Sequence, residues 1–297
     1  MTKKIVEITK DFTQNTLLHK DTIYVIIGEI RVNPFVKIEI EDKTEIFLKN
    51  GFFKNQSGTK YIKSKLIFET GSKLCANSVF LKACNDKNKP VKLASNGGLY
   101  FVGSNLLTEK DGINSNQNGP KSLFKANLIH TSYLGSGDIA NLSEEQDIGI
   151  DDYDGISVLG VSKKEWNVKK IYCEYSGDDG FDVQNSQIVL DGLTVIMPEE
   201  DGLNLVSSTV EVKKNIKVIV TLTDKPDRDM FDFENDTNFC LLKLNKGCKV
   251  DLYGLFGDQL NLLSADMPQP FLNVYKFKGT LSCGESLIFT NDYLLDK

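Results

Sequence analysis

Apolar and polar residues alternate along most of the chain with the two-residue period of β-strands. Within residues 181–184, Phe181 and Val183 point to one side, whereas Asp182 and Gln184 point to the other. The runs 22–32, 35–51, 64–85 and 89–105 are equally β-rich and are divided by Gly, Asn and Asp. Helix signals are scarce. The pattern therefore predicts an all-β protein.

A short motif recurs through the second half of the chain: Asp, any residue, an apolar residue, Ser, Asp or Asn, and another apolar residue. It stands as DGISV at 154, DGFDV at 179, DGLNL at 201, DMFDF at 229 and DQLNL at 258. Steps of roughly 22–29 residues are too short for a propeller blade or a domain, but they fit one coil of a parallel β-helix. The repeat predicts a single-stranded parallel β-helix of about 10–12 coils.

The same pattern predicts one domain over residues 1–297. Residues 1–21 are expected to form an N-terminal cap, and residues 224–297 are expected to form less regular coils. The polar, Gly- and Asn-rich stretch 108–122 is expected to be a loop insertion between coils.

Several stretches carry a family resemblance. FVKIEIEDKTEIFLKNG with SKLIFETGSKLCANS, then NGGLYFVGS, DYDGISVLGVSKK and SGDDGFDVQNSQIVLDGLTV, resemble the coils of secreted bacterial proteins of the pectate-lyase-like superfamily. The similarity covers roughly residues 22–215 and fades beyond residue 224. It implies a right-handed parallel β-helix. Members of that superfamily include lyases, hydrolases, epimerases, phage tailspikes and adhesins, so the resemblance implies no single activity.

Composition narrows the possible partners. The formal net charge is −6, with a basic first third and a strongly acidic remainder, which disfavours a nucleic-acid partner. No apolar run is long enough for a membrane span, and the N-terminus does not read as a signal peptide.

None of the six cysteines forms a C-x-x-C pair, and most are expected in the core: Cys75, Cys84, Cys173, Cys240, Cys248 and Cys283. Free cysteines allow a cytoplasmic location, whereas the resemblance suggests a secreted or cell-surface one, so localisation and oligomeric state stay open.

The repeat predicts two columns of side chains, because stacked rungs lie about 4.8 Å apart. The first column holds Asp154, Asp179, Asp201, Asp229 and Asp258, and the second holds Asp182, Asn204, Asp232 and Asn261. Like charges at that spacing repel by about 1 kcal/mol per pair even in water, so something must offset the repulsion. The architectural explanation is that each Asp accepts backbone N–H bonds at a turn, followed by Gly for its φ freedom.

Two chemical explanations of the same carboxylates compete with the architectural one. The first is a calcium site, since adjacent coils would supply the oxygens of Asp152, Asp154, Asp178, Asp179 and Asp182. The second is catalysis by paired carboxylates, with Asp179, Asp182 and Asp201 as candidates and Arg228 as the basic partner. Polygalacturonase-type hydrolases on this fold also carry later His-Gly and Arg-x-Lys motifs, which this chain lacks.

Aromatic residues near the Asp motifs suggest a carbohydrate-binding face. Tyr153, Trp166 and Tyr175, with Asp178, are the candidate binding residues, although packing also explains the rings. His130 is expected to be a hydrogen-bonded structural residue.

The favoured hypothesis is a non-catalytic β-helix that binds or displays, with a polysaccharide or cell-surface glycan as partner and either no cofactor or calcium. The alternative is a polysaccharide lyase or glycoside hydrolase acting on an acidic polysaccharide.

Overall fold

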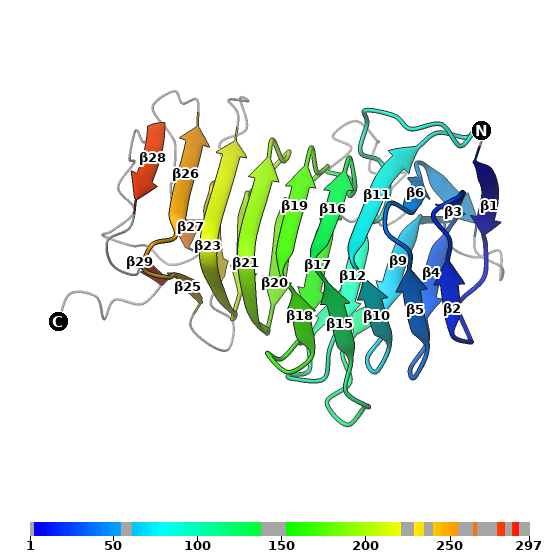
Figure 1. The fold of residues 1–297 in the computed structure, drawn as a ribbon, viewed down its shortest axis with the longest axis horizontal. Helices are drawn as coiled ribbons and strands as arrows, with labels where there is room; N and C mark the ends of the chain where they lie inside the picture. Colours follow the sequence, from blue (N-terminus) through cyan, green and yellow to red (C-terminus); the bar gives the residue numbers. More distant parts are fainter. Residues whose placement is uncertain are drawn as a thin grey trace, which may run out of the picture.

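The computed structural model describes residues 3–54, 61–137, 153–220, 229–234, 240–254, 264–265, 278–282 and 287–290. Within these ranges the protein is all-β and contains no helix. The strands lie side by side along the long axis of the molecule, with the N-terminal strands at one end and the C-terminal strands at the other (Figure 1). Most of them belong to three sheets, which are numbered 1 to 3 below.

Sheet 1 has 12 strands: β1 (Lys4–Ile8), β3 (Thr22–Ile26), β6 (Glu45–Lys49), β11 (Ser78–Cys84), β16 (Leu128–Ser132), β19 (Lys170–Glu174), β21 (Gln187–Ile196), β23 (Thr209–Val220), β25 (Leu241–Leu244) and β29 (Leu287–Thr290), with β26 (Lys249–Gly254) beside β23 and β28 (Lys278–Ser282) beside β26. Sheet 2 has 8 strands: β4 (Glu29–Val32), β9 (Lys65–Phe68), β12 (Leu99–Val102), β17 (Ile156–Leu159), β20 (Phe181–Gln184), β22 (Leu203–Val206), β24 (Phe231–Glu234) and β27 (Ser264–Ala265). Sheet 3 has 5 strands: β2 (Thr16–Leu18), β5 (Lys37–Ile40), β10 (Lys73–Ala76), β15 (Leu123–Ala126) and β18 (Trp166–Val168). Two hairpins stand apart from the sheets, β7 (Phe52–Lys54) with β8 (Tyr61–Lys63) and β13 (Glu109–Lys110) with β14 (Ile113–Asn114).

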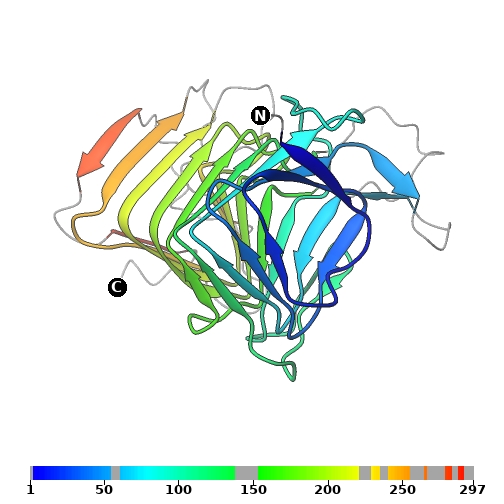
Figure 2. The same ribbon diagram turned by 45° about the vertical axis from the view of Figure 1, so that its right-hand side comes forward.

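From β4 to β19 the chain visits sheets 2, 3 and 1 in turn and adds one strand to each on every pass, and from β19 to β25 it alternates between sheets 1 and 2. β4, β5 and β6 come from sheets 2, 3 and 1, and β9, β10 and β11 repeat that order one rung further along. Pairing within the sheets is parallel, except that β29 and β28 run antiparallel to β25 and β26. Figure 2 shows strands on several sides of a common interior. The predicted all-β, parallel-stranded architecture is confirmed, and the arrangement is compatible with a parallel β-solenoid.

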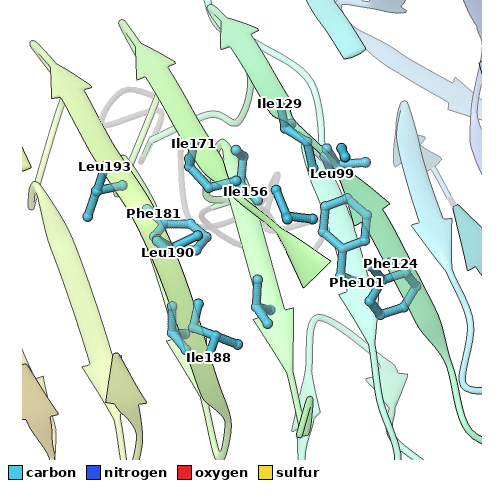
Figure 3. Close-up of a cluster of buried hydrophobic side chains, with 14 of the residues drawn as sticks. Leu99, Phe101, Phe124, Ile129, Ile156, Ile171, Phe181, Ile188, Leu190 and Leu193 are labelled. Atoms are coloured by element: carbon cyan, nitrogen blue, oxygen red, sulfur yellow. The ribbon is translucent and has the colours of Figure 1, made fainter. Parts of the chain in front are cut away.

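Apolar ladders fill the interior, because the register stacks equivalent residues of successive rungs. In sheet 2, Leu99 pairs with Ile156 and Phe181 pairs with Leu203, and all four side chains are buried. Figure 3 shows Leu99, Ile156 and Phe181 in this interior. The two-sided alternation predicted for residues 181–184 is also confirmed, since Phe181 and Val183 belong to this core and Asp182 does not.

An aromatic cluster reinforces the middle of the core. The ring of Phe101 lies 5.3 Å from that of Phe68, 5.0 Å from that of Phe124 and 5.6 Å from that of Trp166, measured between centroids. Edge-on and offset ring contacts of this kind stabilise a core beyond the area that they bury.

The cysteines largely follow the expectation. Cys84, Cys173, Cys240 and Cys248 are free and buried. Cys75, on β10, is exposed instead, because its side chain alternates with that of the buried Leu74. Cys283 lies outside the described residues.

The segments predicted as an N-terminal cap and as a loop insertion can be located in the structure. In the region 1–21, β1 and β2 are the end strands of sheets 1 and 3. The insertion 108–122 lies between β12 and β15 and contains the β13–β14 hairpin. No segment of the described chain forms a helix of the length and hydropathy that a membrane span requires.

Candidate functional site

The predicted Asp column exists over four rungs. Asp154, Asp179, Asp201 and Asp229 each lie two residues before a strand of sheet 2, and the parallel register brings these strand starts into line. The Oδ1 atom of Asp179 accepts a hydrogen bond from the backbone N–H of Asp201 at 3.0 Å, and Oδ1 of Asp201 accepts one from Asp229 at 2.5 Å. The carboxyl groups of Asp179 and Asp201 thus each tie one rung to the next. Asp258 lies outside the described residues.

The glycine after the Asp is required because a Cβ atom would clash there, and not because of its φ value. Gly155, Gly180 and Gly202 do not have positive φ values. A Cβ atom on Gly180 would lie 2.2 Å from Cγ1 of Val195 and 2.8 Å from the carbonyl oxygen of Gly202. The expectation that φ selects these glycines is therefore wrong: the chain turns so close to the core and to the next coil that no side chain fits.

The second column is confirmed for three rungs and differs at the fourth. Asp182 pairs with Asn204, which pairs with Asp232. The position facing Asp232 on the last described rung is Ser264 rather than Asn261, so the register differs by three residues from the one that the motif predicts. Asn204 Nδ2 donates a hydrogen bond to Glu234 at 2.8 Å, so the amide links this column to the next strand.

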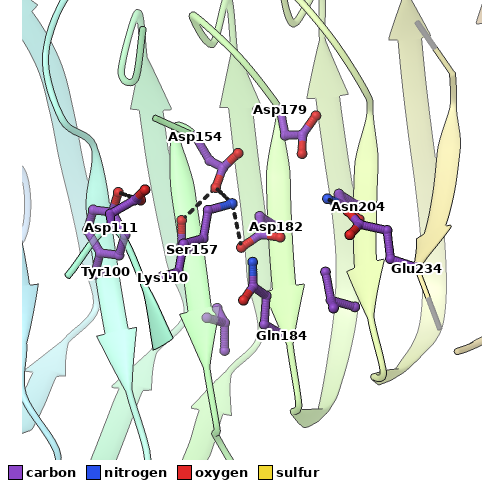
Figure 4. A network of polar contacts seen from close by, with 12 residues as sticks. Tyr100, Lys110, Asp111, Asp154, Ser157, Asp179, Asp182, Gln184, Asn204 and Glu234 are labelled. Atoms are coloured by element: carbon purple, nitrogen blue, oxygen red, sulfur yellow. Dashed lines mark hydrogen bonds and ion pairs between the residues drawn. The ribbon is translucent and has the colours of Figure 1, made fainter. Parts of the chain in front are cut away.

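Lys110 offsets the carboxylate repulsion. The β13–β14 hairpin holds this side chain over sheet 2, with Nζ 2.5 Å from Oδ2 of Asp154 and 3.4 Å from Oδ2 of Asp182 (Figure 4). Ser157 Oγ donates a further hydrogen bond to the same Asp154 oxygen at 2.9 Å. Asp154 and Asp182 are 1% and 0% exposed, so the ion pairs lie away from bulk water. Nothing in the local sequence distinguishes Lys110 from the other lysines, and sequence reasoning missed it.

Protonation is the second effect that reduces the repulsion between the carboxyl groups. Burial raises the pKa of Asp178 to about 10, aided by the charges of Asp179 and Asp154 and by a hydrogen bond with Glu200. Burial likewise raises the pKa values of Asp179, Asp182 and Asp201 well above the usual range. Burial thus favours the neutral form of Asp178, Asp179, Asp182 and Asp201 and weakens the repulsion between them.

Two of the carboxylates predicted to bind calcium are paired with Lys110. The ammonium group of Lys110 lies between Asp154 and Asp182 and contacts both carboxyl groups. Among the described residues no group of three or more His, Cys, Asp or Glu side chains could hold a metal ion. Asp152 lies outside that part of the chain. Calcium binding stays a prediction from the sequence.

The catalytic candidates are brought together but enclosed. Asp179, Asp182 and Asp201 are 5%, 0% and 7% exposed, so an extended polysaccharide does not reach them in this structure. Arg228 lies outside the described residues.

Two of the aromatic candidates are buried. Trp166 packs inside the solenoid against Phe101 and Phe124 and is 5% exposed. Tyr153 is 6% exposed, and its ring lies 4.1 Å from Nζ of Lys65 and 5.3 Å from Nζ of Lys63. Cation–π contacts hold this ring in place. Neither ring offers a free face to a ligand.

The third aromatic candidate lines an open recess. Tyr175 stacks on Tyr133 with ring centroids 4.8 Å apart and planes 7° from parallel. Both residues have positive φ values, 58° at Tyr133 and 54° at Tyr175, at the bend that follows sheet 1. With Lys92, Leu93, Ser176 and Glu199 they line a recess of about 300 Å³, which we call the tyrosine recess.

Tyr175 and Leu93 are the exposed apolar side chains of the tyrosine recess, at 38% and 63%. Asp178 follows the lining residue Gly177 in the chain and is 9% exposed. Sequence reasoning found Tyr175 but missed Tyr133, because the two are far apart in the chain and only the register between β16 and β19 stacks them.

His130 lies on the outer face of sheet 1. Its ring centroid is 4.4 Å from that of Tyr172 and 5.7 Å from that of Phe80. Its Nε2 atom is 3.4 Å from both Oε1 of Glu174 and Oγ of Ser132. These contacts describe a residue held by its neighbours, as expected from the sequence.

No known relative identifies the chain. No family model matches it, and neither the curated proteins nor the solved structures contain a match. The function must therefore be argued from the tyrosine recess and the enclosed carboxyl column themselves.

Proposed function

We propose that the protein is a right-handed parallel β-helix of the pectate-lyase-like superfamily that binds a glycan without cleaving it. The tyrosine recess is the proposed binding site, and a polysaccharide or a glycan at a cell surface is the proposed partner. The observation that carries the proposal is the stacked pair Tyr133 and Tyr175, which lines an open recess while the carboxyl groups of sheet 2 are enclosed.

The chemistry of the recess suits a sugar. Tyrosine rings present apolar carbon to the C–H faces of a sugar and a hydroxyl group to its oxygens. Lys92 and Glu199 supply a donor and an acceptor beside the rings, and Leu93 adds apolar surface. A volume of about 300 Å³ is at the small end of ligand sites, so the recess accommodates a short part of a longer chain.

The positive φ values of both tyrosines support a binding role. A positive φ is unfavourable for a residue with a bulky side chain, and such conformations cluster at functional sites. Here the backbone N–H of Tyr175 donates to the carbonyl oxygen of Ile196 at 2.8 Å, and that of Tyr133 donates to Glu174 at 3.0 Å. These bonds hold the two rings at fixed positions before a ligand arrives, which lowers the entropic cost of binding.

The test is a binding assay on immobilised neutral and acidic polysaccharides. We expect wild-type protein to be retained, and Tyr175→Ala to bind about tenfold more weakly, which corresponds to about 1.4 kcal/mol. Tyr61→Ala is the matched control, because Tyr61 is also exposed (50%) but lies on the β7–β8 hairpin. Equal losses in both variants, or no retention of the wild type on any glycan, would refute the proposal.

A second candidate function is glycoside hydrolysis beside the same recess. Asp178 follows the lining residues Ser176 and Gly177, stays protonated at neutral pH and shares a hydrogen bond with Glu200. A carboxylic acid that stays protonated at neutral pH can serve as the general acid of a glycosidase. Release of reducing ends from a bound polysaccharide, abolished in Asp178→Asn, would replace the non-catalytic proposal with this one.

A further inference from the structure

The contact between Lys110 and Asp154 brings an amine and a carboxyl group together in an enclosed place. Nζ of Lys110 lies 2.5 Å from Oδ2 of Asp154, and the two side chains are 19% and 1% exposed. The partners come from different elements, the β13–β14 hairpin and the turn before β17. The hairpin thus holds the amine against sheet 2.

A third group lies against the same nitrogen. Oδ2 of Asp182 is 3.4 Å from Nζ of Lys110, and this side chain is 0% exposed. Apart from this contact with Lys110, the oxygens of Asp182 have no hydrogen-bond partner, and Oδ1 of Asp154 has none either. Figure 4 shows the three side chains converging on one point. Buried polar atoms are nearly always paired, so two carboxyl groups with unpaired oxygens beside one amine require an explanation.

We propose that Lys110 and Asp154 condense to form an isopeptide cross-link, with Asp182 as the acid that assists the reaction. The ammonium group must first pass a proton to the Asp154 carboxylate, because only the neutral amine has the lone pair that attacks. The nitrogen lone pair then attacks Cγ of Asp154. Asp182 donates a proton to the departing hydroxyl group and takes one from the nitrogen, so that it is regenerated. One ammonium and one carboxylate become one secondary amide and one water, without oxidation or reduction.

Two physical effects favour this condensation. Holding the reacting atoms in contact replaces a bimolecular encounter by an intramolecular step, for which effective concentrations reach about 10⁵–10⁸ M. Exclusion of water removes the hydration shells that make an ordinary lysine–aspartate pair unreactive. Other lysine pairs of the described chain lack this setting: Lys214 with Asp191 is 67% and 23% exposed, and Lys3 with Glu45 is 33% and 31% exposed.

The cross-link would fasten the hairpin to the solenoid. Residues 111–153 would become a closed loop, which resists unfolding and proteolysis because the unfolded chain is constrained. This inference is independent of the tyrosine recess, so it stands whether or not the protein binds a glycan.

Intact-mass spectrometry of the purified, folded protein tests the proposal. The wild type is expected to be lighter than its sequence by one water molecule. Trypsin should then release one branched species that joins residues 93–121 to residues 126–163, uncleaved after Lys110. Lys110→Arg keeps the positive charge but should show its full calculated mass. Lys121→Arg is the matched control in the same insertion and should keep the loss.

Two further variants separate the roles of the carboxyl groups. Asp182→Asn retains both reacting partners and should show mostly uncondensed mass. Asp154→Asn should form the same amide by losing ammonia instead of water.

Two results would overturn the proposal. One is a wild type that keeps its full mass while circular dichroism shows it to be folded. The other is a water loss that persists in Lys110→Arg, because an Asp-Gly sequence such as Asp154-Gly155 can also lose water by forming a succinimide within one peptide. The branched peptide distinguishes the two reactions, and the wild-type protein alone decides the matter even where a variant fails to fold.

Discussion

Replacing Gly180 by alanine tests why Asp-Gly recurs along the solenoid. The new Cβ would lie 2.2 Å from Cγ1 of Val195 and 2.8 Å from the carbonyl oxygen of Gly202. Overpacking of a dense interior costs about 1–3 kcal/mol. Because the φ value of Gly180 is not positive, alanine regains about 0.4–1 kcal/mol through the unfolded chain. We therefore expect a net loss of about 1–2 kcal/mol in the free energy of unfolding, measured by urea denaturation.

A double-mutant cycle sharpens this prediction. Val195→Ala alone should cost about 1.5–3 kcal/mol, the value of a buried valine side chain. Gly180→Ala together with Val195→Ala should cost less than the sum, because removal of Cγ1 makes room for the new methyl group. Gly192→Ala is the control: its Cβ would meet the side-chain oxygen of Asn215 at 2.8 Å, which can rotate away. Strict additivity, or a Gly180→Ala protein as stable as the wild type, would refute the steric explanation.

Three further predictions follow from single buried groups. Burial holds the pKa of Asp178 at about 10, so the folded state keeps a proton that the unfolded state releases above about pH 4. The contribution of Asp178 to stability should therefore fall as the pH rises from 4 toward 10, by at most about 1.4 kcal/mol per unit. The difference between the urea midpoints at pH 5 and 8 should become smaller in Asp178→Asn, although Asp179, Asp182 and Asp201 keep their raised pKa values; an unchanged difference would contradict this. Glu165 is buried and accepts hydrogen bonds from Ser104, Ser122 and Ser162; Glu165→Gln should cost about 1.5–3 kcal/mol by chemical denaturation, since its amide would face donors, and an unchanged midpoint would contradict this. Phe101→Ala should cost about 3–5 kcal/mol in the same assay, because three aromatic rings surround the cavity it leaves, and a loss below 1 kcal/mol would show that they collapse into it.

The stacked rungs could be predicted from the sequence because they follow from a short-range periodicity of apolar and polar residues. A two-residue alternation defines which side chains enter the core, and the recurring Asp motif marks where β17, β20, β22 and β24 of sheet 2 begin. The weak point was the last rung, where Ser264 rather than Asn261 faces Asp232. In that rung more residues separate the motif Asp from the strand than in the earlier rungs, and the motif alone does not predict their number.

The candidate site could be predicted only in part. Asp154, Asp179 and Asp182 were correctly placed in neighbouring columns, but their burial was not foreseen. An outward-facing residue on a strand is solvated unless another segment covers it. The covering hairpin with Lys110 belongs to a stretch whose composition indicates only a loop.

The sequence by itself determined the all-β class, the repeat and the residues that stack from rung to rung, because these depend on near neighbours and on a short period. Only the tertiary structure decided which carboxyl groups are shielded from solvent, which lysine contacts them and which two tyrosines line an open recess. The physical reason is that burial, charge and pKa depend on groups distant in the chain, and no local pattern records which of them will meet.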